Sequence, residues 1–481
     1  MTFNKSAGTY VTDMLLSALN YKNLFKAFLL FAILYNGYRY FYFPWDKGGQ
    51  APSMPLYFSI LKDAPWAIIV FLGLGGLYCN RKNPAGPLYR KWEKYDYWTL
   101  FFIIAHIILL SVAVAHLSHK NPIDVFQRDI KNVQYVFLPL IFPLIIKSEH
   151  DIIKHLDWLT IIGVSVSLFG YYTHLFVPAF TLENAVLSTL QSPICFGTFA
   201  VILFMIALPR VLESEVSAYW YSALCLFYGS ILLSASAAAL LSMIVGTLFV
   251  LFISRPRLSS LKRVCVLMII SSLIFYGLGF FNKLTGKVNN SVSSYTSLNG
   301  IKSYEEVNIK PAGKPSFSWD FLKIPYNPIS DNTYRFTTQY TSIAARKVYF
   351  EEITKYLKTA SVKNILWGDF SLKNHFEYDN VYFYFIKNDG IIVTALILSL
   401  LSGGIFTGFK KFKKLKKSGR TKMAGISLGV TAALFILTVI QFNLSYFFTI
   451  YPLNFLTYFL LVLIAFINPS DESNMQSDQV Q

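Results

Sequence analysis

The chain has 481 residues, of which 54% are hydrophobic and only 14% are charged, and its formal net charge is +17. Soluble proteins carry charge on about a quarter of their residues, so this composition excludes an ordinary soluble protein, a disordered chain and a small disulfide-built scaffold. Apolar runs close to the roughly 20 residues needed to cross a bilayer recur along the chain. The sequence therefore predicts an all-α polytopic membrane protein.

Read in chain order, twelve apolar runs predict membrane-spanning helices. They lie near residues 23–43, 64–80, 97–117, 131–147, 157–177, 190–208, 218–235, 237–253, 264–281, 389–408, 423–442 and 447–467. The fourth run is short and contains Pro139 and Pro143, so we expect either a kinked span or a re-entrant segment packed against protein. Only residues 234–236 separate the seventh and eighth runs, which predicts a tight hairpin in preference to one long buried helix.

Basic residues divide the connections between these spans into two alternating sets. One set carries 22 lysines and arginines, including those of the block Lys410–Lys417, and the other short connections carry five. Cytoplasmic loops of membrane proteins hold such an excess, so we expect both termini in the cytoplasm and the loop 282–388 outside. The net charge is explained by this topology and by contact with anionic lipid, and it does not imply a nucleic-acid partner.

The predicted spans divide the chain into four regions. These are an N-terminal membrane bundle of about nine spans (1–281), a large external loop (282–388), a C-terminal membrane bundle of about three spans (389–467) and a cytoplasmic tail (468–481). The loop of about 107 residues is too long for a connector and roughly enough for a small subdomain. We therefore expect the functional residues to lie in this loop.

The second half of the external loop has a regular pattern. From Thr341 to Ala360, apolar residues recur at helical spacing, which predicts an amphipathic helix that Ser361 and the region of Asn364 end. A short apolar stretch follows and closes at Gly368. The segment that returns to the membrane then begins an aromatic belt of the kind found at membrane interfaces.

Four residues of the loop have side chains suited to chemistry on a phosphate. Arg346 lies on the predicted helix and Arg335 precedes it, although a solvated surface charge is the default interpretation of a single arginine. His375 and Asp379 are spaced i,i+4, which places both on one face of a helix. Arginine binds phosphate oxygens, whereas an imidazole or carboxylate can take a proton from a hydroxyl. This combination suits transfer from a phosphate-linked donor to a hydroxyl acceptor, with no metal or other cofactor implied.

Three short motifs occur in order in this part of the chain. They are an A-R-x-x-x-Y-E-like helix (Ala345–Glu351), a W-G-like turn (Trp367–Gly368) and a D-N-x9-G sequence that leads into the next span (Asp379–Asn380, then Gly390). Together with about a dozen spans and a large external loop late in the chain, they resemble the bacterial O-antigen polymerase and O-antigen ligase superfamily. The topology resembles that family over nearly the whole chain, and the motifs over residues 341–400.

The resemblance implies a metal-independent glycosyltransferase in the bacterial inner membrane. Members of the family move glycans from undecaprenyl diphosphate on the outer face of that membrane, either to another lipid-linked repeat unit (polymerases) or to lipid A core (ligases). Asp379 stands where ligases have histidine, and Asp379–Tyr382 looks like a polymerase sequence. The stretch Ser234–Ala238 also lacks the arginine expected of a ligase. Both departures favour a polymerase.

The resemblance and the residue chemistry together imply roles for the loop residues. Arg346, helped by Arg335, would bind the donor diphosphate, and either Asp379 or His375 would deprotonate the acceptor hydroxyl. Three further residues would border the glycan: Asn380, Tyr382 and Tyr384. The implied partners are the lipid-linked glycan donor and acceptor, the lipid bilayer and, for a polymerase, a chain-length regulator.

Other classes of membrane protein remain as alternatives. A flippase or exporter of lipid-linked glycans would share the topology but would not need a large loop bearing Arg346 and Asp379. A lipid-phosphate-dependent glycosyltransferase of another type would place its carboxylate in the first external loop, where Asp46 and Asp63 occur. An ion-coupled transporter would place charges within spans and show related halves, which this sequence does not. A protein acceptor, as in related O-oligosaccharyltransferases, stays open.

Overall fold

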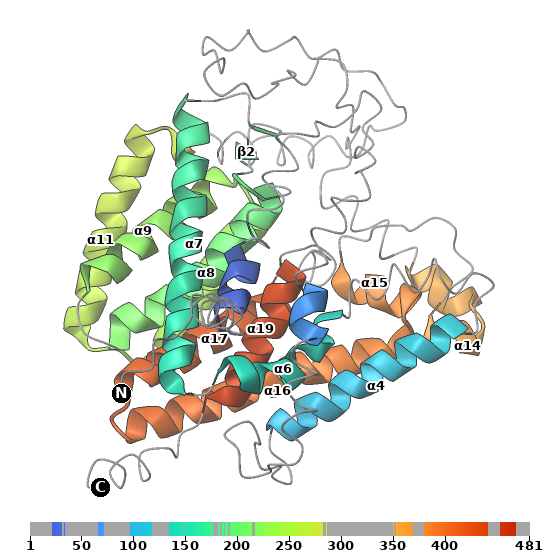
Figure 1. The fold of residues 1–481 in the computed structure, drawn as a ribbon. Helices are drawn as coiled ribbons and strands as arrows, with labels where there is room; N and C mark the ends of the chain where they lie inside the picture. The colour runs from blue at the N-terminus through green and yellow to red at the C-terminus, as the bar shows by residue number, and fades with distance from the viewer. Residues whose placement is uncertain are drawn as a thin grey trace, which may run out of the picture.

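In the computed structural model, helices form nearly all of the part of the chain that is described (Figure 1). The described residues are 22–30, 33, 66–71, 97–117, 134–146, 148–176, 181–182, 185–186, 188–190, 193–213, 217–281, 285, 350, 353–368, 380–440 and 453–467. The exception is an antiparallel pair of two-residue strands, β1 (Thr181–Leu182) and β2 (Ala185–Val186). The predicted all-α fold class is thereby confirmed.

The helices follow one another in an order close to the predicted one. They are α4 (Tyr97–Leu117), the 3-10 turn η1 (Gln134–Phe137), α6 (Leu138–Ile145), α7 (Glu149–Phe176), α8 (Pro193–Glu213), α9 (Ala218–Leu233), α10 (Ala237–Ser254), α11 (Leu258–Gly277), α14 (Val362–Trp367), α15 (Val381–Asn388), α16 (Gly390–Lys417), α17 (Thr421–Val439) and α19 (Leu453–Phe466). Residues 22–30 and 66–71, inside the first two predicted spans, are also helical.

Six of the helices in the described part are long and apolar enough to cross a membrane: α7, α8, α10, α11, α16 and α17. Shorter apolar stretches occur in α4, α9 and α19. The fold is therefore that of a membrane-embedded protein, as the composition predicts. Most of the predicted external loop and all of the tail 468–481 lie outside the described residues.

Several helices extend beyond the apolar runs that predicted them. α7 begins at Glu149, α11 begins at Leu258, and α16 continues to Lys417. The basic block Lys410–Lys417, predicted to lie in the connection after this span, forms the last two turns of α16. Hydropathy marks only the part of a helix that contacts hydrocarbon, whereas lysine has a good helix propensity and continues the helix beyond it.

The short fourth run forms η1 and α6, which are packed inside the protein. The eight residues of α6 extend about 12 Å, well short of a hydrocarbon core of about 30 Å. Tyr135 and Phe142 are buried, and the Phe142 ring lies 4.9 Å from Phe466 and 5.9 Å from Phe459, both of α19. Of the two predicted alternatives, this length and burial fit the segment packed against protein.

A tight turn separates α9 from α10, as predicted. Ala235 has a positive φ of 47°, and the Ser236 side chain caps α10 by accepting a hydrogen bond from the Ala239 amide at 3.3 Å. A Cβ added to Gly197 of α8 would lie 2.6 Å from the Ser234 hydroxyl, so the turn sits against α8. The chain reverses direction between α9 and α10, and both helices pack mainly against α8.

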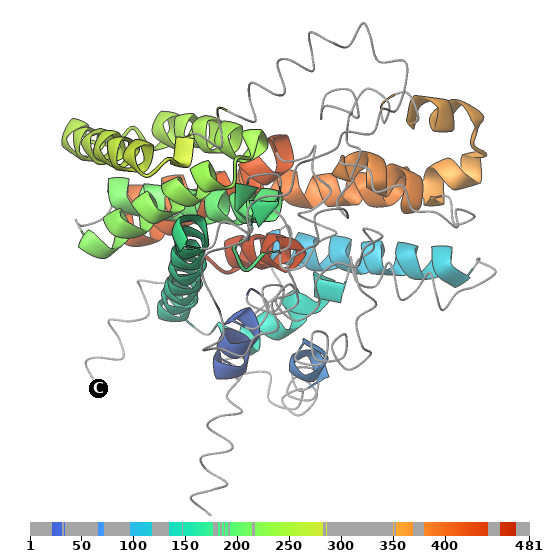
Figure 2. The same ribbon diagram turned by 90° about the horizontal axis from the view of Figure 1, so that it is seen from above.

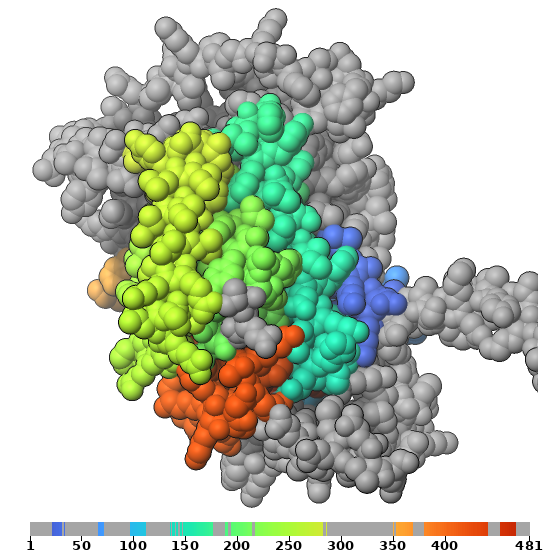
Figure 3. Space-filling model, turned by 90° about the vertical axis from the view of Figure 1, so that its left-hand side faces the viewer, coloured from blue at the N-terminus to red at the C-terminus, as the bar shows by residue number. Residues whose placement is uncertain are grey.

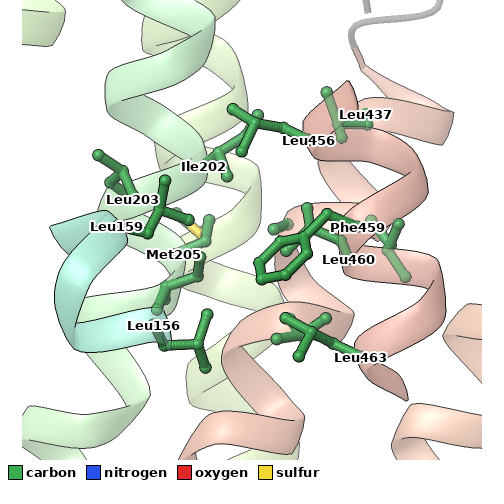
Figure 4. Close-up of a cluster of buried hydrophobic side chains, with 14 of the residues drawn as sticks. Leu156, Leu159, Ile202, Leu203, Met205, Leu437, Leu456, Phe459, Leu460 and Leu463 are labelled. Carbon is green, nitrogen blue, oxygen red and sulfur yellow. The ribbon is translucent and has the colours of Figure 1, made fainter. Parts of the chain in front are cut away.

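The core of the bundle is formed by α8, α17 and α19, and α11 stands at its edge. Every residue of α8 from Cys195 to Leu212 is buried. A cluster of buried side chains joins α7, α8, α17 and α19 (Figure 4), and it includes Leu156, Leu159, Ile202, Leu203, Met205, Leu437, Leu456, Phe459, Leu460 and Leu463. Figure 3 shows α11 on the surface beside α7, and its outward side chains are apolar, as expected for contact with lipid.

Four ion pairs lie at one end of the bundle, and we call them the charged layer. Its pairs are Lys22–Asp151 at 2.6 Å, Arg210–Asp157 at 2.8 Å, Lys416–Glu213 at 2.7 Å, and Arg420–Glu149. The basic residues of these pairs all come from the set of connections with the large excess of positive charge. The charged layer connects α16 and α17 to α7 and α8, whereas α14 and α15 lie at the opposite end of α16 (Figures 1 and 2).

Close packing between α16 and α17 depends on Gly408, and its replacement by alanine should lower the thermal stability of the protein. A Cβ there would lie 2.0 Å from the Thr431 hydroxyl, and Ser427 donates a hydrogen bond to the Gly408 carbonyl at 3.0 Å. Overpacking of this kind costs about 1–3 kcal/mol. Melting of the purified full-length protein in detergent measures the effect.

The matched control for this substitution is Gly277→Ala on α11, where no described atom lies within 4 Å of the added Cβ. Alanine is favoured over glycine in a helix by about 1 kcal/mol, so the control should be neutral or stabilising. Equal melting temperatures for the two variants would contradict the close approach at Gly408.

Candidate functional site

The structure describes only part of the predicted site. Arg335, Arg346, His375 and Asp379 lie outside the described residues, so their predicted roles stay predictions. The described part contains the end of the loop helix, α14, α15 and the start of α16. These elements carry the W-G-like turn and, of the third motif, Asn380 and Gly390, and Figure 2 shows α14 and α15 together at one end of α16.

The end of the predicted amphipathic helix is confirmed. Residues 353–359 are helical, Ile353 is buried, and the helix stops before Ser361. Ser361 then caps α14 by accepting a hydrogen bond from the Asn364 amide at 3.2 Å, and the Tyr356 hydroxyl donates to the Asn364 carbonyl at 3.0 Å. Asn364 therefore belongs to the next helix instead of ending the first, and the two short helices are tied together.

Asn380 is the residue at which α15 (Val381–Asn388) begins. Its side-chain oxygen accepts hydrogen bonds from the Tyr382 and Phe383 amides at 2.9 and 3.1 Å, and its own backbone is extended. This is an N-cap, which satisfies two amides that have no partner within the helix. Because α15 starts after Asn380, it contains neither His375 nor Asp379. The prediction that both lie on one helix face concerns residues outside the described ones, so it stays a prediction.

The two predicted tyrosines of α15 have different surroundings. The Tyr382 hydroxyl donates a hydrogen bond to the Thr438 carbonyl at 2.8 Å, near the end of α17. That carbonyl is one of the last four of its helix, which have no partner within the helix. Burial raises the pKa of the Tyr382 phenol, so it stays neutral at physiological pH. Tyr382 thus fastens α15 to α17, whereas the half-buried Tyr384 stacks edge-on against Phe385 at 5.6 Å.

Two glycines bring the W-G-like turn against the junction of α15 and α16. Gly368, at φ 93°, ends α14, and a Cβ there would lie 2.0 Å from the Asn388 carbonyl oxygen. Gly390, at φ 83°, separates α15 from α16, and a Cβ there would lie 2.1 Å from the Leu366 carbonyl oxygen. Both positions require glycine for two reasons. A backbone with positive φ disfavours any side chain, and the facing backbone leaves no room for a Cβ. We call this contact the glycine interlock.

Asn388 and Asp389, inside the interlock, are polar residues that sequence reasoning did not assign to the site. Both are buried, with 8% and 6% of their surface exposed. The Asn388 side-chain nitrogen makes no hydrogen bond within the described structure, and the Asp389 carboxylate acts electrostatically on the Tyr458 hydroxyl of α19. A buried carboxylate beside an amide donor can position a hydroxyl group, which accepts from one and donates to the other. The signal available in the sequence was three consecutive polar residues, Lys387–Asp389, at the edge of a span.

No family model matches the sequence, and no curated protein matches it. The family likeness therefore depends on the three motifs and their placement, and the structure brings the second motif into contact with the end of the third.

Proposed function

We propose that the protein is an O-antigen polymerase-like glycosyltransferase. It transfers a growing glycan from undecaprenyl diphosphate to a lipid-linked repeat unit on the outer face of the bacterial inner membrane. The observation that carries the proposal is the glycine interlock, because it joins the W-G-like turn to the glycine of the third motif through direct backbone contact. Two motifs that are separate in the sequence thus belong to one structural unit at the end of a span.

The proposed topology has a periplasmic loop over 282–388, a cytoplasmic C-terminus and about eleven spans, with the fourth predicted run as a re-entrant segment. Six helices long enough to cross a membrane, with shorter apolar helices among them in the described part, support it. The separation of the charged layer from the glycine interlock by the length of α16 supports it as well. Chemistry in this topology would take place at the end of the bundle that carries α14 and α15.

The proposed reaction needs one base and one anion-binding group. The acceptor hydroxyl oxygen forms a bond to the anomeric carbon of the donor, and its proton passes to Asp379 or His375. The bond from that carbon to the diphosphate breaks, and undecaprenyl diphosphate leaves with its charge offset by Arg346 and Arg335. Asn388 and Asp389 would support this site from the membrane boundary.

Substitution of the proposed site residues should abolish chain growth. In a deletion strain, wild type should restore the ladder of surface glycan lengths, whereas Arg346→Ala and Asp379→Asn should reduce polymerisation by about 100-fold or more. His375→Ala decides whether histidine or aspartate is the base. Membrane levels of the variants are matched, and Lys363→Gln, an exposed residue of α14, is the control.

The same strain separates the alternatives. Core carrying a single repeat in the deletion means a polymerase, whereas complete loss of attached glycan with long lipid-linked chains accumulating means a ligase. A flippase would show no transfer when the purified protein receives a lipid-linked donor and acceptor. Unchanged ladders in all three site variants would refute the proposed site.

A further inference from the structure

α16 is longer than a membrane crossing requires. Its 28 residues extend about 42 Å at the helical rise, against a hydrocarbon core of about 30 Å. The helix starts at the glycine interlock, and it carries no charged residue from Ile391 to Phe409. The excess length therefore falls at its other end, over Lys410–Lys417.

Two lysines of this end face the protein. Lys411 donates hydrogen bonds to the Ile464 and Ala465 carbonyls at 2.8 and 3.0 Å, at the end of α19. Lys416 pairs with Glu213 at 2.7 Å in the charged layer. These lysines hold neighbouring helices in place, so they are not available to a ligand.

The other four lysines form an exposed stripe, which we call the basic face. It consists of Lys410, Lys413, Lys414 and Lys417. Their spacing of i, i+3, i+4 and i+7 places them on one side of the helix. Phe406 and Phe409 lie one turn deeper, with the Lys410 ammonium 4.3 Å from the first ring and the Lys413 ammonium 4.1 Å from the second. Phe406 is 59% exposed, so the stripe continues as apolar surface toward the membrane interior.

We propose that the basic face binds the phosphate groups of anionic phospholipids. No acidic residue occurs from Gly390 to Lys422, so the stripe has a single sign of charge. Lysine stems lie along apolar surface while their ammonium groups reach the headgroups, and aromatic rings sit at the boundary with the acyl chains. A soluble anion would account for the lysines alone, whereas a phospholipid also accounts for the exposed phenylalanine beneath them. The partner is therefore a lipid molecule of this leaflet.

The test measures the binding of phosphatidylglycerol to the purified full-length protein by native mass spectrometry. The triple variant Lys410→Gln, Lys413→Gln, Lys417→Gln should bind it roughly 100-fold more weakly than wild type, since each lysine near an anionic surface contributes about fivefold. Phosphatidylcholine binding should not change. Excess inorganic phosphate should fail to displace the lipid, because it lacks acyl chains.

The control replaces three exposed lysines at the other end of the protein, Lys355, Lys358 and Lys363, by glutamine. It changes the net charge equally and should leave the affinity for phosphatidylglycerol as in wild type. Equal weakening by both triple variants would show a general charge effect and overturn the proposal. Displacement of the lipid by inorganic phosphate would overturn it too, by assigning the basic face to soluble anions.

Discussion

Gly390→Ala is expected to destabilise the protein by about 2–5 kcal/mol, and Gly368→Ala by a similar amount. Placing a side chain in the left-handed region costs about 1–2 kcal/mol, and forcing an atom into a packed contact costs about 1–3 kcal/mol more. At Gly390 the new Cβ would meet the Leu366 carbonyl oxygen at 2.1 Å, and backbone atoms cannot rotate away as a side chain would. Melting of the full-length protein measures the loss, and the glycan ladder should shorten with it.

Gly419→Ala separates the two contributions. Gly419 lies between α16 and α17 with φ 78°, yet no described atom lies within 4 Å of its added Cβ. Only the backbone cost of about 1–2 kcal/mol applies there. If all three variants melted at the same temperature, the backbone contact of the glycine interlock would be refuted.

Asp157→Asn should also destabilise the protein strongly, because it leaves a buried cation without its carboxylate. The Arg210 side chain is 2% exposed, pairs with Asp157 at 2.8 Å and lies 4.1 Å from the centre of the Trp220 ring. Removing one partner of a buried ion pair costs about 3–5 kcal/mol. Asp157 is 41% exposed, so solvent screening reduces the expected loss to about 2–3 kcal/mol.

A double-mutant cycle tests whether the charge itself is responsible. In Arg210→Met combined with Asp157→Asn, the cation is replaced by an apolar chain that still packs on Trp220. The double variant should therefore be more stable than Asp157→Asn alone, since a buried ion pair can be replaced by apolar groups at little cost. Losses that simply add would show that the two residues act independently.

Composition and apolar runs predict the fold class and most helices, because the bilayer demands long helices whatever their neighbours. α4 occupies the predicted residues 97–117. Helix ends are harder to predict, since the last two turns of α16 are rich in lysine and hydropathy does not mark them as helix. The break at Gly390 depends on a close approach by Leu366, which hydropathy does not report.

The candidate site also has features that the local sequence predicts and features that depend on packing between distant segments. The cap at Asn380 follows from a local rule that the sequence already contained, an asparagine ahead of a helical run. The burial of Asn388 and Asp389 instead results from packing at the glycine interlock and against α19, which joins segments distant in the sequence. Sequence reasoning therefore found the motifs but not the polar residues that packing encloses beside them.

The charged layer has a consequence for how the molecule is assembled. Lys416 follows Glu213 by 203 positions, and Arg420 pairs with a still earlier residue, Glu149. Segments that are synthesised early cannot complete their contacts until the later segments that supply the partner residues have been made. A nascent chain that already contains α7 and α8 carries these two acidic residues without these cations until the late hairpin α16–α17 has been inserted. Membrane insertion of that hairpin therefore completes the first half of the protein as well as the last.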